Sequence, residues 1–166
     1  MVAKTVKPKA ISRLKAPQGR PQFLEASASS ILMNSNDGIR ELLIKAKTIA
    51  VIGLSSNPMR ASFGVSEYMQ RKGYRIVPVN PNEHTVLGEK SYATLADVPE
   101  KIDLVDVFRR SEYVSEIVDE VIRLKIPALW LQEGVVDHSA AKKARDADVF
   151  VVMDKCIFKE HRARAL

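Results

Sequence analysis

Four short polar segments of the chain have the residue types that bind phosphates, and each directly follows an apolar run of strand length. An arginine side chain offers a planar fork that pairs with two phosphate oxygens. Backbone N–H groups at the start of a helix favour an anion as well. Arg60 lies just beyond the first of these segments. The segments are Gly53-Leu54-Ser55-Ser56, Asn80-Pro81-Asn82, Phe108-Arg109-Arg110 and Gln132-Glu133-Gly134.

The first two segments belong to a predicted strand–helix–strand unit between residues 48 and 82. The run Ile49–Ile52 has no polar alternation, which is typical of a strand covered on both faces. An amphipathic helical period starts near Ser62, with Val65, Tyr68, Met69 and Lys72 on one face, and Gly73 suits its C-terminal cap. Residues 74–79 then predict a second strand, reached by a right-handed crossover.

The rest of the chain alternates strands and helices in the same way. A helix capped by Asn36 or Asp37 precedes the first strand. Residues 83–101 predict irregular structure with a brief strand near Val86, a turn at Leu87-Gly88 and one helical turn capped by Thr94. Further strands are expected at 103–108, 128–131 and 149–153, with helices capped by Ser111, capped by Asp137 or Ser139, and running from 154 to 164.

This alternation predicts an α/β fold: a doubly wound, Rossmann-like, mostly parallel five-stranded sheet with helices on both faces. In a parallel sheet the carboxyl ends of the strands lie along one edge. Open α/β folds bind their ligands at that edge. The four polar segments are therefore expected to meet there.

The composition limits the class of protein. The chain has 166 residues, which suits one domain with a sizeable core. Its single cysteine excludes an intramolecular disulfide framework and favours a reducing compartment, which we take to be the cytoplasm. Apolar runs stay well below the roughly 20 residues needed to cross a bilayer, so no membrane partner is expected.

The net charge of +6 is concentrated at the beginning of the sequence. Residues 1–30 contain six Lys or Arg residues and one Glu, so the remainder is nearly neutral. We expect a mobile basic extension over residues 1–35 and a folded domain over 36–166. The extension also resembles an organelle transit peptide, which would place the protein in an organelle matrix. The charge distribution does not indicate a nucleic-acid partner.

The polar segments also have structural interpretations. Ser55 and Ser56 are common turn and cap residues, and Gln132 and Glu133 suit an exposed loop as well as a ligand contact. Arg109 and Arg110 are different, because cations at a helix start oppose the helix dipole, which favours a functional role.

Two familiar nucleotide motifs are missing. A dinucleotide fingerprint starting at Gly53 would need glycine at positions 55 and 58, where the chain has Ser55 and Pro58. The acid that holds a ribose hydroxyl after the second strand is replaced by Asn80. A G-K-[ST] phosphate loop does not occur in the sequence.

The combined motifs nevertheless resemble a known family. The segments GLSSNPMRASFGV, VPVNP, DLVDVFRR, LWLQEGV and VVMDKCIFKEH are similar to those of the small CoA-binding domain family, over residues 37 to 162. That family has a Rossmann-like fold related to the CoA-binding domain of the succinyl-CoA synthetase alpha subunit.

The resemblance implies a site for coenzyme A. It implies that the phosphates are surrounded by Gly53, Ser55, Ser56 and Arg60, and that the adenosine lies beside Asn80 and Pro81. It also implies that the middle of the cofactor is lined by Phe108, Arg109 and Arg110, and that the pantetheine arm is flanked by Gln132, Glu133 and Gly134. Charge agrees with this assignment, because CoA carries a pyrophosphate and a ribose 3′-phosphate.

No catalytic residues are identified from the sequence. The catalytic histidine of the synthetase lies in a further domain that this sequence does not match. His84, His138 and His161 show no metal-like or triad-like spacing and are expected on the surface, whereas Trp130 is expected in the core. No metal site is predicted.

Cys156 is the remaining reactive group. It follows the fifth strand, and Lys155 or a helix N-terminus could stabilise its thiolate. A buried, inert thiol is the alternative. The reactive interpretation predicts a mixed disulfide with the CoA thiol under oxidising conditions.

The resulting functional prediction is a CoA or acyl-CoA binding protein, a sensor or carrier, with a small-molecule partner. The alternatives are an NAD(P)-dependent oxidoreductase or a CoA-linked transferase that uses the same sheet edge, and an interaction module that uses the fold as a scaffold.

Overall fold

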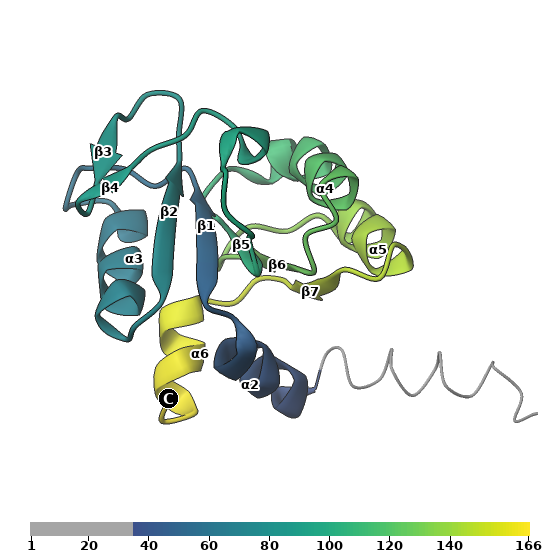
Figure 1. Cartoon of the computed structure of the whole chain (residues 1–166). Coiled ribbons are helices and arrows are strands. Elements are labelled where there is room, and N and C mark those ends of the chain that lie inside the picture. Colours follow the sequence, from purple (N-terminus) through teal and green to yellow (C-terminus); the bar gives the residue numbers. More distant parts are fainter. Residues whose placement is uncertain (1–34) are drawn as a thin grey trace, which may run out of the picture.

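The computed structural model describes residues 35–166 and contains one five-stranded parallel sheet at its centre (Figure 1). The strand order is β2-β1-β5-β6-β7. This confirms the predicted parallel sheet. The strands are Thr48–Ile52 (β1), Arg75–Val79 (β2), Leu104–Val107 (β5), Ala128–Leu131 (β6) and Phe150–Val152 (β7).

Helices cover both faces of the sheet, as the doubly wound fold requires (Figure 1). Helices α2 (Asn36–Lys45), α3 (Ala61–Arg71) and α6 (Ile157–Ala163) pack on one face. Helices α4 (Val114–Arg123) and α5 (His138–Asp146) pack on the other.

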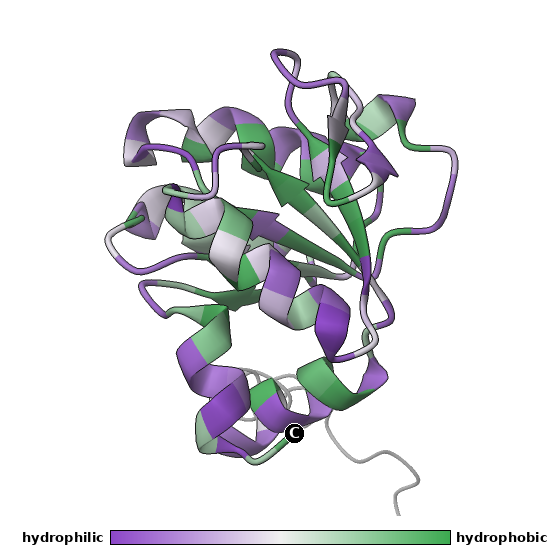
Figure 2. Ribbon diagram, turned by 90° about the vertical axis from the view of Figure 1, so that its left-hand side faces the viewer, coloured by the Kyte–Doolittle hydropathy of each residue, from purple (hydrophilic) through white to green (hydrophobic). Residues whose placement is uncertain are grey.

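The core forms two apolar clusters separated by the sheet. Side chains alternate along a strand, so Ile49 and Val51 of β1 join the cluster under α2, α3 and α6, while Ala50 joins the cluster under α4 and α5. All three residues are at most 1% exposed, which explains the uninterrupted apolar run. Figure 2 shows the hydrophobic colour along the strands and the mixed colour of the helices around them.

A small hairpin and a short helical turn follow β2. Strands β3 (Thr85–Val86) and β4 (Glu89–Lys90) are antiparallel, and Leu87 and Gly88 form the turn with φ of 54° and 78°. The 3₁₀ turn η1 (Leu95–Asp97) is closed by the Asp97 carboxylate, which accepts hydrogen bonds from Thr94 N (3.0 Å) and Thr94 Oγ (2.8 Å). The predicted strand, turn and single helical turn are all present.

Two predicted helix caps are wrong. Ser35 caps α2 through Oγ, which accepts from Gly38 N at 3.1 Å, so Asn36 is already helical. Ser111 instead begins the 3₁₀ turn η2 (Ser111–Tyr113), and its Oγ accepts from Val136 N at 2.9 Å. Helix α4 therefore begins only at Val114.

Other predicted helix ends differ less. Asp137 caps α5 as expected, with Oδ1 accepting from Ala140 N at 2.9 Å. Gly73, with φ of 95°, directly follows Lys72, the C-terminal cap of α3. Helix α6 begins at Ile157, three residues later than predicted.

The predicted mobile extension lies outside the described residues, apart from Ser35. Between residues 35 and 166, no helix has both the length and the apolar character needed to span a bilayer.

Candidate functional site

The strand order reverses between β1 and β5, and Gly53 lies at this switch point. The chain leaves β1 towards β2 on one side and returns to β5 on the other. Gly53 has φ of 82°, and a Cβ atom there would stand 2.6 Å from the carbonyl oxygen of Phe108. Gly53 N also donates to Val79 O at 2.9 Å. The ends of β1, β2 and β5 thus meet at a position that only glycine occupies without strain.

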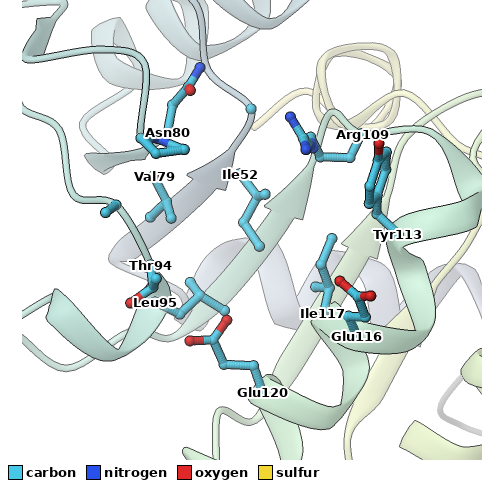
Figure 3. A pocket seen from close by; sticks show the side chains of 13 residues that line it. Ile52, Val79, Asn80, Thr94, Leu95, Arg109, Tyr113, Glu116, Ile117 and Glu120 are labelled. Atoms are coloured by element: carbon cyan, nitrogen blue, oxygen red, sulfur yellow. The ribbon is translucent and has the colours of Figure 1, made fainter.

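A first cavity, the switch-point cavity, opens beside Gly53 and has a volume of about 210 Å³ (Figure 3). Its walls come from the ends of β1 and β2, the segment leading into η1, and the start of α4. Its apolar side chains include Ile52, Val79, Leu95 and Ile117, and its polar ones include Asn80, Thr94, Arg109, Tyr113, Glu116 and Glu120.

A second cavity, the loop cavity, lies on the other side of Gly53 and has a volume of about 340 Å³. It includes the start of α3, whose N-cap residue Arg60 provides no capping side chain. The first turn of α3 also has no acidic residue. An uncapped helix start without acids favours an anion. The cavity is lined by Gly53, Ser55, Arg60, Ala61, Ser62 and Phe108.

Two arginines at these cavities have no anionic partner among residues 35–166. Arg109 lies over the ring of Tyr113, 4.6 Å from guanidinium carbon to ring centre, and forms no ion pair there. The Arg60 guanidinium is likewise unpaired within the described chain. Arg110 differs, because it pairs with Glu112 at 3.4 Å. Arg60 and Arg109 are therefore available to an anionic ligand.

Asn80 and Ser55 hold the walls of the site in place. Asn80 Nδ2 donates to Leu54 O at 3.0 Å, which ties the end of β2 to the loop after β1. Ser55 N donates to Ser62 Oγ at 3.2 Å, which ties that loop to α3. Pro81 lines the switch-point cavity beside Asn80.

Ser56 is exposed, and its backbone N–H is already bonded to an acid. Its N–H donates to Glu83 Oε1 at 2.8 Å. This hydrogen bond, first among several, lowers the pKa of the Glu83 carboxyl. Any anion that binds to the Ser56 N–H must displace this carboxylate.

The exit of β6 contributes to neither of these two cavities. Gln132 is buried, and its Nε2 donates to Asp106 Oδ1 at 2.7 Å. Burial raises the pKa of Asp106 to about 7, against the lowering effect of the Gln132 hydrogen bond. Of the two interpretations of Gln132, the exposed loop is thus wrong, since its buried side chain forms a hydrogen bond with a buried carboxyl group.

The two neighbours of Gln132 take part in local contacts. Glu133 is exposed and pairs with Lys159 at 2.7 Å. Gly134 has φ of 83°, and its N–H donates to Asp154 Oδ1 at 2.8 Å. These contacts join the exits of β6 and β7.

The expectation of a surface position is wrong for His161. This residue is 2% exposed, its Nδ1 hydrogen-bonds with the Tyr68 hydroxyl at 3.0 Å, and burial lowers its pKa. It shares the buried face of α6 with Ile157, four residues earlier, which is the sequence signal for its burial. His84 and His138 are exposed as expected. Trp130 is in the core as expected, with Nε1 donating to Lys155 O at 2.6 Å.

Cys156 is half-buried and is the N-cap residue of α6. The Lys155 ammonium lies 3.7 Å from Glu160. The Lys155 ammonium is thus paired with the carboxylate of Glu160 rather than with the thiol of Cys156. Among residues 35–166, no three potential metal-binding side chains are grouped closely enough to hold an ion.

Sequence reasoning missed several residues of the switch-point cavity. Tyr113, Glu116, Ile117 and Glu120 recur at intervals of three and four, so they share one face of α4 and its preceding turn. Ser62 and Ser66 were also missed; both are buried on α3. Of the predicted face of α3, Met69 is buried, and Val65 and Tyr68 are half-buried against the same apolar cluster. The helical spacing of these residues is visible in the sequence, but the sequence does not show which part of the sheet each helix face packs against.

Comparisons with known proteins identify relatives. The chain is 41% identical over 123 residues to the uncharacterized protein YneT of Bacillus subtilis, covering 74% of this chain and 91% of YneT. It is 30% identical over 80 residues to an ADP-forming acetate–CoA ligase of Archaeoglobus fulgidus, covering 47% of this chain and only 12% of the ligase. A structure of a hypothetical protein from Pyrococcus horikoshii matches with a TM-score of 0.76 and 32% identity, covering 89% of this chain and 98% of that one.

The family comparison covers most of the described domain. Residues 47–162 match the family described as "CoA binding domain". This range includes both cavities and all five strands of the sheet. The chain therefore belongs to the CoA-binding domain family.

Proposed function

We propose that this chain binds coenzyme A or an acyl-CoA at the carboxyl edge of the sheet, around the β1–β5 switch point. The observation that carries the proposal is that Arg60 and Arg109, at two cavities that share Gly53, have no anionic partner among residues 35–166. The Arg60 guanidinium at the uncapped start of α3, together with Arg109 in the adjoining cavity, suits a pyrophosphate. Membership of the CoA-binding domain family supports the same ligand.

The two cavities suggest which part of the ligand each of them binds. Gly53, Ser55, Ser56 and Arg60 act as the phosphate-binding loop, in the loop cavity and at its rim. Asn80 and Pro81 hold the adenosine in the switch-point cavity.

The remaining predicted residues extend the site along the sheet edge. Phe108, Arg109 and Arg110 contact the middle of the cofactor. The pantetheine arm then runs towards Gln132, Glu133 and Gly134. Gln132 acts there through the position of its backbone, because its side chain is committed to Asp106.

We infer a carrier or sensor role in the cytoplasm. The titratable side chains that line the two cavities are Arg60, Arg109, Tyr113, Glu116 and Glu120. This set suits binding of an anionic nucleotide more than acyl transfer, which uses an activated nucleophile.

The second candidate is a dinucleotide-dependent oxidoreductase or a CoA-linked transferase. The glycine with positive φ at the switch point favours it, because dinucleotides bind at such a point. Asn80 disfavours it, because an acid commonly holds the ribose hydroxyl at the end of β2.

Calorimetric titration with CoA, NAD and NADP in parallel tests the proposal. Saturable binding of CoA without binding of NAD or NADP is expected. Binding of NADP alone would support the oxidoreductase instead. No heat from any of the three would contradict a nucleotide-binding role.

Cys156 adds a redox element to the proposal. Its thiolate attacks one sulfur of CoA disulfide, forms a protein–CoA disulfide and releases one CoA thiol. Intact mass spectrometry after incubation with CoA disulfide is expected to show a DTT-reversible adduct. An adduct that persists in Cys156→Ala would reject the assignment to this residue.

A further inference from the structure

The switch-point cavity has opposite charges at its two ends. Figure 3 shows the Arg109 guanidinium and Asn80 at one end and the carboxylates of Glu116 and Glu120 at the other, with apolar side chains between them. Ligand sites combine an apolar lining with a few placed polar groups that fix the orientation of the ligand. The lining of this cavity therefore suits a ligand that has an anionic group at one end and a hydrogen-bond donor at the other.

The two glutamates have different surroundings. Glu120 Oε1 accepts from Ala96 N at 3.2 Å and lies 3.6 Å from Arg123 Nη2. Glu120 thereby joins α4 to η1 and positions the wall that carries Leu95. The side chain of Glu116, one turn earlier on the same face, makes no hydrogen bond or ion pair with residues 35–166. Its carboxylate remains available as an acceptor for a ligand.

The volume restricts which part of a ligand enters. At about 210 Å³ the cavity is smaller than the roughly 300–1,000 Å³ of a site for a whole drug-sized molecule. It suits a single ring system, with the remainder of the ligand extending towards Gly53 and the loop cavity. The apolar side chains Ile52, Val79, Leu95 and Ile117 provide the surfaces for the two faces of such a ring.

We propose that Glu116 determines base specificity by accepting a hydrogen bond from the exocyclic amino group of adenine. The inference rests on the proposed function, because CoA supplies both an adenine and the phosphates that Arg109 attracts. Glu116 thus acts as a specificity residue, and Glu120 as the residue that positions the opposing wall. The carboxylate also discourages entry of a phosphate, so the nucleotide can bind in one direction only.

The direction in which ligand affinity changes on removal of Glu116 separates hydrogen bonding to the base from simple charge repulsion. If Glu116 only repelled the ligand phosphates, its removal would tighten binding of every phosphorylated ligand. If Glu116 accepts from the amino group, its removal weakens only those ligands that have that group. Asp119 lies on α4 like Glu116, pairs with Lys143 of α5 and lines neither cavity. It is the matched site for removal of one negative charge.

The test compares two probes by calorimetry on the full chain: adenosine 3′,5′-bisphosphate and its purine riboside analogue, in which hydrogen replaces the amino group. The unmodified protein is expected to bind the adenosine probe about tenfold more tightly, as one charge-assisted hydrogen bond provides. Glu116→Ala is expected to abolish this preference, and Glu116→Gln, which keeps an acceptor oxygen, to retain part of it. Asp119→Asn is expected to keep all of it.

Equal affinities of the unmodified protein for the two probes, or a preference that survives in Glu116→Ala, would overturn the role of Glu116 and leave CoA binding intact. Failure of the unmodified protein to bind either probe or CoA would overturn the proposed function, and this inference with it.

Discussion

The backbone N–H of Ser56 donates to the carboxylate of Glu83 at 2.8 Å, across the gap between the loop after β1 and the loop after β2. Glu83 is thus an anion held at the loop that we propose binds phosphate. The two residues are 27 positions apart in the sequence, and the adjacency of β1 and β2 brings them together.

Replacement of Glu83 by Gln is predicted to tighten CoA binding a few-fold. The carboxylate repels the incoming phosphates and occupies a donor that they can use. Calorimetry at low ionic strength is the measurement, and the gain is expected to shrink with added salt. Glu67→Gln, which removes an exposed charge from α3, is the control. Weaker binding in Glu83→Gln would mean that Glu83 holds the loop in its binding conformation.

Replacement of Gly53 by Ala is predicted to destabilise the fold by more than about 2 kcal/mol. The new Cβ would meet Phe108 O at 2.6 Å, and the positive φ adds backbone strain. Gly64 in α3 is the matched control: a Cβ there has no neighbour within 4 Å, so Gly64→Ala is expected to stabilise by about 0.5–1 kcal/mol. Denaturant unfolding measures both variants. A Gly53→Ala protein as stable as the unmodified one would show that β1 and β5 separate easily.

Replacement of Arg109 by Ala is predicted to weaken CoA binding about tenfold or more, with little effect on pantetheine. A hydrogen bond between charged groups contributes about 1.5–3 kcal/mol, and pantetheine has no phosphate to provide one. Titrations of both ligands measure the difference. Arg71→Ala, which removes an exposed cation from α3, should change neither affinity. Equal losses for the two ligands would indicate that Arg109 acts through the fold.

The Asp106–Gln132 pair predicts a specific dependence of stability on pH. Burial raises the pKa of Asp106 from 3.8 to about 7, so the folded state keeps its proton where the unfolded state has lost it. The contribution of Asp106 to the free energy of unfolding is therefore complete below pH 4. It decreases as the pH rises to about 7, by at most about 4 kcal/mol.

The Asp106→Asn variant tests this dependence. Asparagine keeps an acceptor for Gln132 Nε2 and cannot ionise. The stability of the variant relative to the unmodified protein is expected to rise between pH 4 and pH 7, as measured by denaturant unfolding. Asp119→Asn, at an exposed site, is the control. Parallel pH profiles for Asp106→Asn and the unmodified protein would show that Asp106 ionises normally in the folded state.

The sheet could be predicted because its signal is local. Uninterrupted apolar runs such as Ile49–Ile52 identify buried strands, and Leu87-Gly88 identifies the turn between β3 and β4. The position of Gly53 at a strand exit was also visible. Its need to be glycine was not, because the atom that excludes a Cβ belongs to Phe108, which is 55 positions away.

The side chains of the site were harder to predict because their roles depend on distant partners. Gln132 follows a strand as Gly53 and Asn80 do, yet its side chain turns to a buried carboxyl group in the neighbouring strand. Ser111 has the residue type of a helix cap, but its hydroxyl binds Val136 N on another loop. Glu116 is an exposed helical acid, and only the placement of α4 beside the end of β1 brings it to the lining of the cavity.

The most direct test of the central claim is a ¹H–¹⁵N NMR titration of the full chain with CoA. Binding at the switch point predicts shifts of the Gly53, Ser55, Ala61 and Arg109 amides, with the Lys47 and Gly73 amides unchanged at the opposite edge of the sheet. Shifts concentrated at Lys47 and Gly73, with Gly53 and Arg109 unmoved, would contradict a CoA site at the carboxyl edge.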